Sequence, residues 1–248
     1  MKPRIIARLD IKGPNLIKGI HLEGLKIVGN PNEYAIKYYQ KGADELLLMD
    51  SVASYYGKNN LIEVIKKTAE NVFIPITVGG GIRSKGDAHR ILKNGADKVA
   101  INTAAVAKPS LIRELAKIFG SQCIVISIEA KKISENKWEV FTQNGRNKTG
   151  IDVLDWIKKS ISLGAGEILL TSIDKDGTKR GFDLGLAASA SKICKVPLII
   201  SGGLGSIDDL KKLLKVGVVD GISAAKALHY NNLSIQEIKK NINKIDLE

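Results

Sequence analysis

The stretch TVGGGIRSKGDAHRILKNGADKVAINTAA, from Thr77 to Ala105, has the pattern of a strand, a glycine turn, a helix and a second strand. The run Ile74 to Val78 is apolar and rich in β-branched residues, and three glycines, Gly79 to Gly81, end it. Glycines at the carboxyl end of a strand let backbone N–H groups approach an anion closely, with a helix N-terminus behind them. The stretch therefore predicts an anion-binding corner.

The same unit returns in the second half of the chain as SGGLGSIDDLKKLLKVGVVDGISAAKA, from Ser201 to Ala227. Two earlier segments also repeat, since RIIARLD resembles CIVISIE and ADELLLMD resembles AGEILLTS. We infer two similar halves, about residues 1–120 and 121–248, although any two strand-turn-helix units share some likeness. Five residues of the first unit have a counterpart 122 residues later: Gly80, Gly81, Ser84, Gly95 and Asn102 match Gly202, Gly203, Ser206, Gly217 and Ala224.

Strand and helix patterns alternate eight times along the chain. Strand patterns begin near Arg4, Glu45, Ile74, Lys98, Cys123, Glu167, Val196 and Asp220. Helical patterns follow over about 32–41, 61–71, 84–93, 109–119, 151–163, 184–193, 207–215 and 234–242. We predict an α/β protein that forms one domain over residues 1–248, a closed parallel (β/α)8 TIM barrel with a two-fold half-barrel repeat. An open doubly wound sheet is the alternative, and glycine corners in both halves disfavour it.

Composition limits the possible partners. The net charge is +12, but the lysines are scattered over the predicted helix faces with no aromatic platform among them. We therefore favour anionic small substrates over nucleic acid. No apolar run approaches the ~20 residues that span a bilayer, and the first residues lack the pattern of a signal peptide. We expect a cytoplasmic protein with no membrane partner, no metal and no other cofactor, in which Cys123 and Cys194 are packing thiols.

Two inserts interrupt the regular spacing, and both follow strands, which places them at the mouth of the barrel. Residues 12–31 hold four glycines before the second predicted strand and show little apolar periodicity, so they predict a long functional loop. Residues 131–150 predict a small hairpin, because Trp138 to Thr142 alternates and Asn144-Gly145 is a turn signal.

Two carboxylates end opposite strands of the predicted ring. Asp10 ends the first strand, and Glu129 ends the fifth in a repeat-related position. If Asp10 points inward, Arg8 and Arg4 point inward below it, because alternate residues of a barrel strand face the lumen. A carboxylate on each side of the mouth suits general acid–base catalysis. The alternative is a pair of surface carboxylates that cap helices.

Charged residues also start four strands, at the opposite end of the barrel. Two are positive and two are negative, so they are expected to pair with one another across the floor. They form either a plug that closes the barrel or a gate through which a small molecule passes. These residues are Arg4, Glu45, Lys98 and Glu167.

The mouth is predicted to hold one anion corner on each side. The first consists of Gly81, Asn102 and Thr103. The second consists of Asp176, Gly177, Gly203, Ala224 and Ala225. Two such corners imply a substrate with a phosphate at each end.

Together these motifs resemble the cyclase subunit of imidazole glycerol phosphate synthase over nearly the whole chain. The resemblance is carried by Asp10 with Lys18-Gly19, TVGGGIR, DKVAINTAAV, FGSQ, GAGEILLTSIDKDGTK and SGGLG. INTAAV, FGSQ and the charges that start strands are similar to the cyclase rather than to the sister isomerase of the histidine pathway. The resemblance implies that ammonia from a separate glutaminase subunit enters through the floor. At the mouth this ammonia would attack a bisphosphorylated formimino-aminoimidazole-carboxamide ribonucleotide, and the products would be imidazole glycerol phosphate and aminoimidazole carboxamide ribotide.

The resemblance also implies roles for individual residues. Asp10 and the carboxylate at Glu129 exchange protons, and Lys18 lies on a loop that closes over the substrate. Asp50 and Thr171 line the mouth. The four floor residues form an ammonia gate, and Asp97 lies where the glutaminase docks as the second subunit of a heterodimer.

Three positions depart from the family pattern, which has an aspartate in place of Glu129, a small residue in place of Arg8 and often a serine in place of Ala225. Because an arginine in the lumen is costly unless paired, we predict an ion pair between Arg8 and Glu129. Such a pair would lower the pKa of Glu129 and narrow the ammonia path.

The departures leave a second function open. Some relatives resemble this cyclase but serve surface-polysaccharide pathways, where they and a glutaminase deliver ammonia to a separate sugar amidotransferase. The retained Asp10, Lys18 and anion corners favour the cyclase, whereas Arg8 and Glu129 favour the other role. A nucleic-acid-binding or scaffold protein is the third class considered.

Overall fold

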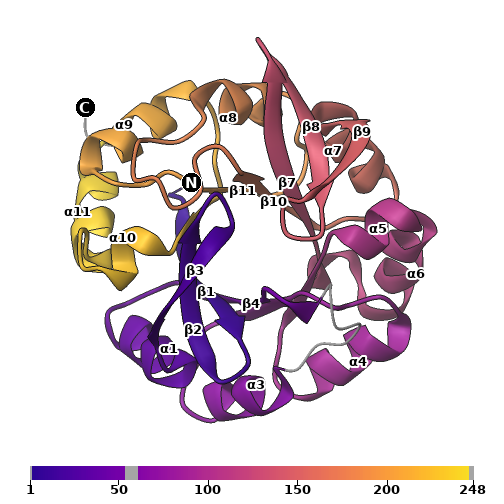
Figure 1. Ribbon diagram of the computed structural model, residues 1–248, viewed down its shortest axis with the longest axis horizontal. Coiled ribbons are helices and arrows are strands. Elements are labelled where there is room, and N and C mark those ends of the chain that lie inside the picture. Colours follow the sequence, from indigo (N-terminus) through magenta and orange to yellow (C-terminus); the bar gives the residue numbers. More distant parts are fainter. Residues whose placement is uncertain (1, 54–60, 246–248) are drawn as a thin grey trace.

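The computed structural model describes residues 2–53 and 61–245. Within these ranges, eight parallel strands close into a ring in which each strand pairs with the next and the last with the first (Figure 1). This ring confirms the predicted (β/α)8 barrel, since an open sheet would leave two unpaired edges. In ring order the strands are β1 Arg4–Lys12, β4 Glu45–Asp50, β5 Ile76–Gly79, β6 Lys98–Ile101, β7 Ile124–Ser134, β10 Glu167–Ser172, β11 Leu198–Ser201 and β12 Gly221–Ala224.

Helices surround the ring, and the helix expected after each strand is present (Figure 1). They are α1 Pro31–Gln40, α3 Ile62–Ala69, α4 Lys85–Lys93, α6 Ser110–Phe119, α7 Val153–Ser162, α8 Leu184–Ser191, α9 Ile207–Val216 and α11 Ile235–Ile245. Two shorter helices, α5 Thr103–Ala107 and α10 Lys226–His229, and a 3₁₀ turn, η1 Ser121–Cys123, occupy connections. In the described ranges, no helix has both the length and the apolar character needed to cross a bilayer.

Prolines explain the two strands that start later than predicted. The strand expected from Ile74 begins at Ile76, and the strand expected from Val196 begins at Leu198. Pro75 and Pro197 directly precede these starts and lack the N–H group that a ladder requires. Each proline carbonyl still accepts a hydrogen bond from the neighbouring strand, at 2.9 Å and 3.0 Å respectively.

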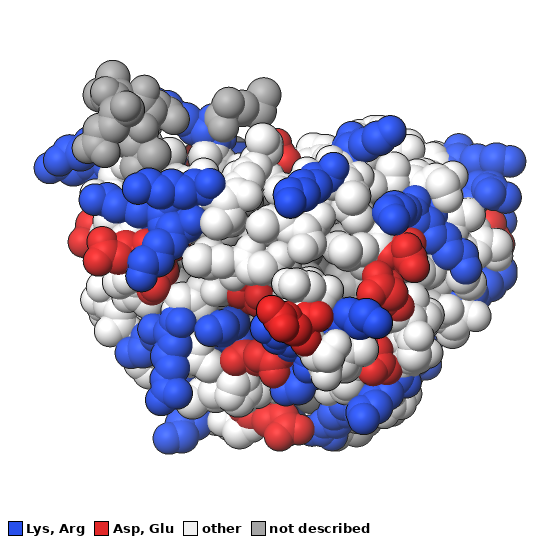
Figure 2. Space-filling model, turned by 90° about the horizontal axis from the view of Figure 1, so that it is seen from above, with Lys and Arg blue, Asp and Glu red and all other residues white. Residues whose placement is uncertain are grey.

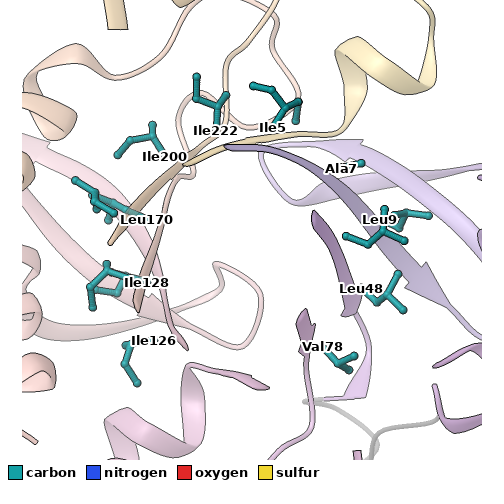
Figure 3. Close-up of a cluster of buried hydrophobic side chains, with 14 of the residues drawn as sticks. Ile5, Ala7, Leu9, Leu48, Val78, Ile126, Ile128, Leu170, Ile200 and Ile222 are labelled. Atoms are coloured by element: carbon teal, nitrogen blue, oxygen red, sulfur yellow. The ribbon is translucent and has the colours of Figure 1, made fainter. Parts of the chain in front are cut away.

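Side chains alternate between the lumen and the helix layer, as the parity argument predicted. The outward residues of the strands form the main core with the helices, and Figure 3 shows several of them arranged around the ring, including Ile5, Leu48 and Ile128. The inward residues form a separate apolar layer across the lumen: Ile6, Leu47, Ala100, Val125, Leu169 and Ile199. This layer separates the charged floor from the polar mouth.

The two-fold repeat is visible in helix caps. Ser84 and Ser206 are the N-caps of α4 and α9, and each hydroxyl accepts from the backbone N–H three residues later at 3.2 Å. After Gly217 the second half carries one additional residue. The cap angles of Asn102 (φ −130°, ψ −87°) therefore match those of Ala225 (φ −126°, ψ −79°), so the predicted match of Asn102 to Ala224 was wrong by one residue.

Both inserts contain antiparallel strands. The prediction of a long loop over 12–31 was wrong, because this insert forms β2 Asn15–Ile20 and β3 Glu23–Gly29, which extend from the end of β1. Backbone pairing with β1 orders this segment despite its weak apolar periodicity. The predicted hairpin over 131–150 is confirmed, with β8 Lys137–Thr142 and β9 Asn147–Asp152 joined through Asn144 and Gly145.

Basic residues are spread over the molecule. On the face shown in Figure 2, lysines and arginines lie across the whole surface with acidic residues among them. This distribution agrees with a positive charge carried on separate helix faces rather than in one basic groove.

Candidate active site

Two hollows open at the carboxyl-end mouth of the barrel, and Arg8 lines both of them. The first hollow contains every residue of the first predicted anion corner, together with Asp50 and Glu129. The second contains every residue of the second predicted corner, together with Lys18. The fold therefore brings the predicted mouth residues into two adjacent sites. A ligand that spans both hollows passes over Arg8.

Asp10 lies between the hollows under two cations. Its Oδ1 accepts from Arg8 Nε at 2.8 Å, and its Oδ2 accepts from Lys18 Nζ at 2.9 Å. Lys18, carried by β2, also donates to Asp176 at 3.0 Å and 3.1 Å. The β2–β3 insert is thus fastened over the mouth by a buried amine that joins both halves of the barrel.

This ion cluster fixes the charge of its members. Burial by itself would raise the pKa of Asp10, but Arg8 and Lys18 outweigh it and hold that pKa well below its ordinary range. Burial would lower the pKa of Lys18, and the carboxylates of Asp10 and Asp176 raise it instead. Asp10 and Lys18 are therefore both charged at neutral pH.

The predicted ion pair between Arg8 and Glu129 was wrong. The Arg8 guanidinium, 5% exposed, is bound by Asp10 and donates to Thr171 Oγ1 at 3.3 Å. Among the described ion pairs, none joins Arg8 to Glu129. Asp10 lies two residues along the same strand face, so it reaches Arg8 without spanning the barrel. Arginine in the lumen is indeed paired, as the burial argument required, but with the other carboxylate.

Glu129 is held by a backbone group rather than by a cation. Its Oε2 accepts from the backbone N–H of Gly145 at 2.7 Å, so the tip of the β8–β9 hairpin positions the side chain. Burial raises the pKa of Glu129 to about 7, against the opposing effects of the Gly145 N–H and the Arg8 charge. The predicted lowering of this pKa was therefore wrong. A carboxyl group that titrates near neutral pH is suited to proton transfer.

The first anion corner is closed by the same hairpin. The Asn102 amide donates to Phe141 O at 3.2 Å, and the backbone N–H of Gln143 donates to Thr103 Oγ1 at 3.1 Å. Gly80 needs its left-handed φ of +92° here, since a Cβ would lie 2.3 Å from Asp50 O. The corner is therefore built from close backbone approach, as the glycine run predicted.

The second corner contains two lysines that the sequence reasoning missed. Lys179 and Lys226 line this hollow beside Lys18, and Lys226 forms no salt bridge with any described residue. Burial, followed by the nearby amines of Lys179 and Lys18, lowers the pKa of Lys226. The sequence did contain an indication of Lys226. In the corrected alignment of the two halves, Lys226 is the counterpart of Thr103, which was predicted to lie in the first corner.

The four predicted floor residues form a closed ring of ion pairs. Arg4 binds Glu45 at 2.7 Å and also binds Glu167. Lys98 binds the same two carboxylates at 3.0 Å and 2.8 Å. The predicted pairing across the floor is confirmed. Both carboxylates are buried, whereas Arg4 is about one-third exposed at the outer surface.

Asp97 has a structural contact beside this ring. Its carboxylate accepts from Ile76 N at 2.8 Å, and its counterpart Asp220 accepts from Leu198 N at 2.9 Å. The same contact is present in both halves of the barrel. The carboxylate of Asp97 therefore has a structural role that requires no partner protein.

Comparison with known proteins assigns the family. The chain matches the family model described as "Histidine biosynthesis protein" over residues 4–234. It is 64% identical over 206 residues to the imidazole glycerol phosphate synthase subunit HisF of Legionella pneumophila, covering 83% of this chain and 97% of that protein. It is 47% identical over 245 residues to the HisF subunit of Bacillus cereus strain Q1, covering 99% of this chain and 97% of that protein. The barrel, its duplicated corners and these similarities agree, and the chain belongs to the HisF family of imidazole glycerol phosphate synthase cyclase subunits.

Proposed function

We propose that this chain catalyses the cyclase reaction at its carboxyl-end mouth. The observation that carries the proposal is that two anion corners meet at Arg8, with Glu129 lining the first hollow and Asp10 bound to Arg8. A bisphosphorylated formimino-aminoimidazole-carboxamide ribonucleotide would place one phosphate in each corner. Its reacting atoms would then lie between the two carboxylates.

Individual residues have distinct proposed roles in this reaction. Asp10 and Glu129 form the acid–base pair, and Lys18 holds the β2–β3 insert over the bound substrate. The corner residues donate backbone N–H groups to the phosphates, with Asp50 and Thr171 on the walls. The reaction needs no metal in this scheme, since the charges at the mouth are supplied by side chains.

Ammonia is proposed to enter from a glutaminase subunit bound at the floor. The ring of Arg4, Glu45, Lys98 and Glu167 is the proposed gate, and Asp97 lies beside it on the exposed surface. Three exposed apolar side chains near this end, two on connections and one in the last turn of α6, support a docking surface. They are Phe73, Ile118 and Val218, which are 78%, 52% and 75% exposed.

Direct turnover tests the cyclase. The purified chain is mixed near neutral pH with the formimino ribonucleotide and enough ammonium salt to supply free ammonia, and the loss of substrate absorbance is followed. We expect turnover without any partner, and turnover with glutamine only after a glutaminase subunit is added. The matched variant Asp10→Asn should reduce turnover by at least a hundredfold, as expected for loss of an acid–base or charge-stabilising group.

A second candidate function is ammonia delivery to a sugar amidotransferase. Arg8 is the observation that favours it, because its buried side chain lies directly between the apolar lumen layer and Asp10. In that case the wild-type chain would show no turnover with ammonium. Activity gained by the double variant Arg8→Cys, Glu129→Asp would assign the chain to this role.

A further inference from the structure

The Asp10 carboxylate has no free oxygen. Arg8 Nε binds Oδ1 at 2.8 Å and Lys18 Nζ binds Oδ2 at 2.9 Å. Both cations are almost fully buried, at 5% and 4% exposure. Protonation of Asp10 would leave two buried cations with one carboxylate fewer, which is strongly unfavourable.

The opposite carboxylate can be neutral without such a penalty. The described hydrogen bond of Glu129 comes from a backbone amide, Gly145 N–H, at 2.7 Å. A protonated Glu129 leaves no buried cation without its partner. Across the same mouth, one carboxylate is thus held as an anion and the other is able to exchange a proton.

We propose that Arg8 is a positioning residue that keeps Asp10 ionised throughout the reaction, so that Glu129 alone gives and takes the proton. This inference rests on the proposed cyclase function and adds a division of roles between its two carboxylates.

Burial and the surrounding charges together also favour an ionised Asp10 and a protonated Glu129. Burial is the largest influence on Glu129 and raises its pKa to about 7, and the charges of Asp10 and Asp176 add to it while Arg8 opposes it. His229, whose pKa burial lowers to about 4, is neutral above that pH. The charged groups facing the two carboxylates from neighbouring elements are Arg8, Lys18, Asp50, Arg83 and Asp176.

The proton balance follows from this division. Ammonia first condenses with the sugar carbonyl carbon, whose oxygen leaves as water with two of the ammonia protons. The same nitrogen then bonds to the formimino carbon, and neutral Glu129 gives its proton to the amine, which leaves with the electron pair of the broken C–N bond. The resulting carboxylate takes a proton from the ammonia-derived nitrogen that has closed the ring. Asp10 remains an anion and holds Arg8 and Lys18 in place beside the reacting groups. Glu129 ends the cycle protonated, as it began.

The test is the pH dependence of kcat with ammonium, at a constant concentration of free ammonia. We expect the wild-type kcat to fall above about pH 7, where Glu129 loses its proton. Glu129→Gln should lose at least a hundredfold in kcat and the pH dependence with it. Arg8→Met should add a second ionisation, that of Asp10, below pH 7. Arg8→Lys should restore the wild-type profile at a lower rate, and the exposed control Arg113→Met should match wild type.

Each outcome decides the inference. A Glu129→Gln variant that keeps the wild-type pH profile, or an Arg8→Met profile that overlays wild type, would overturn it while the cyclase function stands. Absence of turnover in the wild type would overturn both. Carboxyl-carbon NMR titration of the same variants gives a readout that needs no turnover. If Asp10 rather than Glu129 titrates near neutral pH, the division of roles is wrong.

Discussion

Lys98 and Glu167 form an ion pair of 2.8 Å across the barrel floor, from strands β6 and β10. Lys98 also binds Glu45, and both carboxylates are at most 5% exposed. Among the described residues, replacing Lys98 by Met would leave the two buried carboxylates with one cation, Arg4, and the hydroxyl of Thr77 on Glu45. We expect a loss of about 3–5 kcal/mol in the free energy of unfolding, measured by urea denaturation.

An exposed lysine provides the matched control for the floor. Lys66 pairs with Glu63 at 3.4 Å on the surface of α3, where both side chains are about half exposed or more. Lys66→Met should change the free energy of unfolding by less than about 0.5 kcal/mol. Similar losses in the two variants would show that the floor ring does not depend on its charge pairing.

The raised pKa of Glu129 predicts a stability that falls as pH rises. Between the ordinary pKa of a glutamate, about 4.3, and the folded value of about 7, the folded protein binds more protons than the unfolded chain. The free energy of unfolding therefore decreases across this window. At about 1.4 kcal/mol per pH unit, the decrease that Glu129 contributes approaches roughly 4 kcal/mol.

Glu129→Gln isolates this contribution, because an amide oxygen can still accept from Gly145. The variant should gain stability relative to wild type between pH 4.5 and 8, as measured by urea denaturation at each pH. Asp10 acts in the opposite direction, since its lowered pKa gives stability that is lost only as the pH falls well below this window. Parallel pH curves for the two proteins would contradict the raised pKa.

The sequence was sufficient for features that depend on periodicity along one strand. Alternation placed Arg4, Arg8 and Asp10 in the lumen, and the glycine runs located both anion corners. The pairing partner of Arg8 could not be read in this way. Asp10 and Glu129 both lie on strands at the mouth, and periodicity does not say which carboxylate Arg8 binds. The choice depends on side-chain reach and on the Gly145 N–H, which donates a hydrogen bond to the Glu129 carboxylate.

The sequence also did not predict segments whose structure depends on contacts with neighbouring elements. The β2–β3 insert has weak periodicity, and its order comes from pairing with β1 and from the buried Lys18 amine. The one-residue shift in the second half lies in a connection, where an insertion leaves the strand and helix patterns intact. Lys226 was missed for this reason.

Gly203 should tolerate no side chain. Its φ is +110°, and an added Cβ would lie 2.1 Å from the carbonyl oxygen of Gly181. Gly42, with a φ of +82° and no atom within 4 Å of an added Cβ, provides the control for backbone strain alone. We expect Gly42→Ala to cost about 1–2 kcal/mol and Gly203→Ala clearly more, in urea denaturation. If the two variants lose the same stability, the backbone around Gly203 can move to make room for the methyl group at no extra cost in free energy.

Lys226 is predicted to bind an anion rather than to stabilise the fold. Its amine lies in the second hollow near Lys18 and Lys179, so in the absence of an anion it is repelled by like charges. Lys226→Ala should therefore leave the stability of the ligand-free protein unchanged or slightly higher. The KM for the phosphorylated substrate should rise about tenfold with little change in kcat, because the lost contact is equally strong in the ground state and the transition state.

Inorganic phosphate separates this binding role from catalysis. Phosphate should raise the Tm of the wild type in a concentration-dependent manner, since a ligand that binds the folded state stabilises it. The rise should be smaller for Lys226→Ala and unchanged for Lys211→Ala, which removes an exposed lysine from α9. If Lys226→Ala responds to phosphate as strongly as wild type does, the amine does not contact the anion, and the second corner binds through its backbone and Lys18 alone.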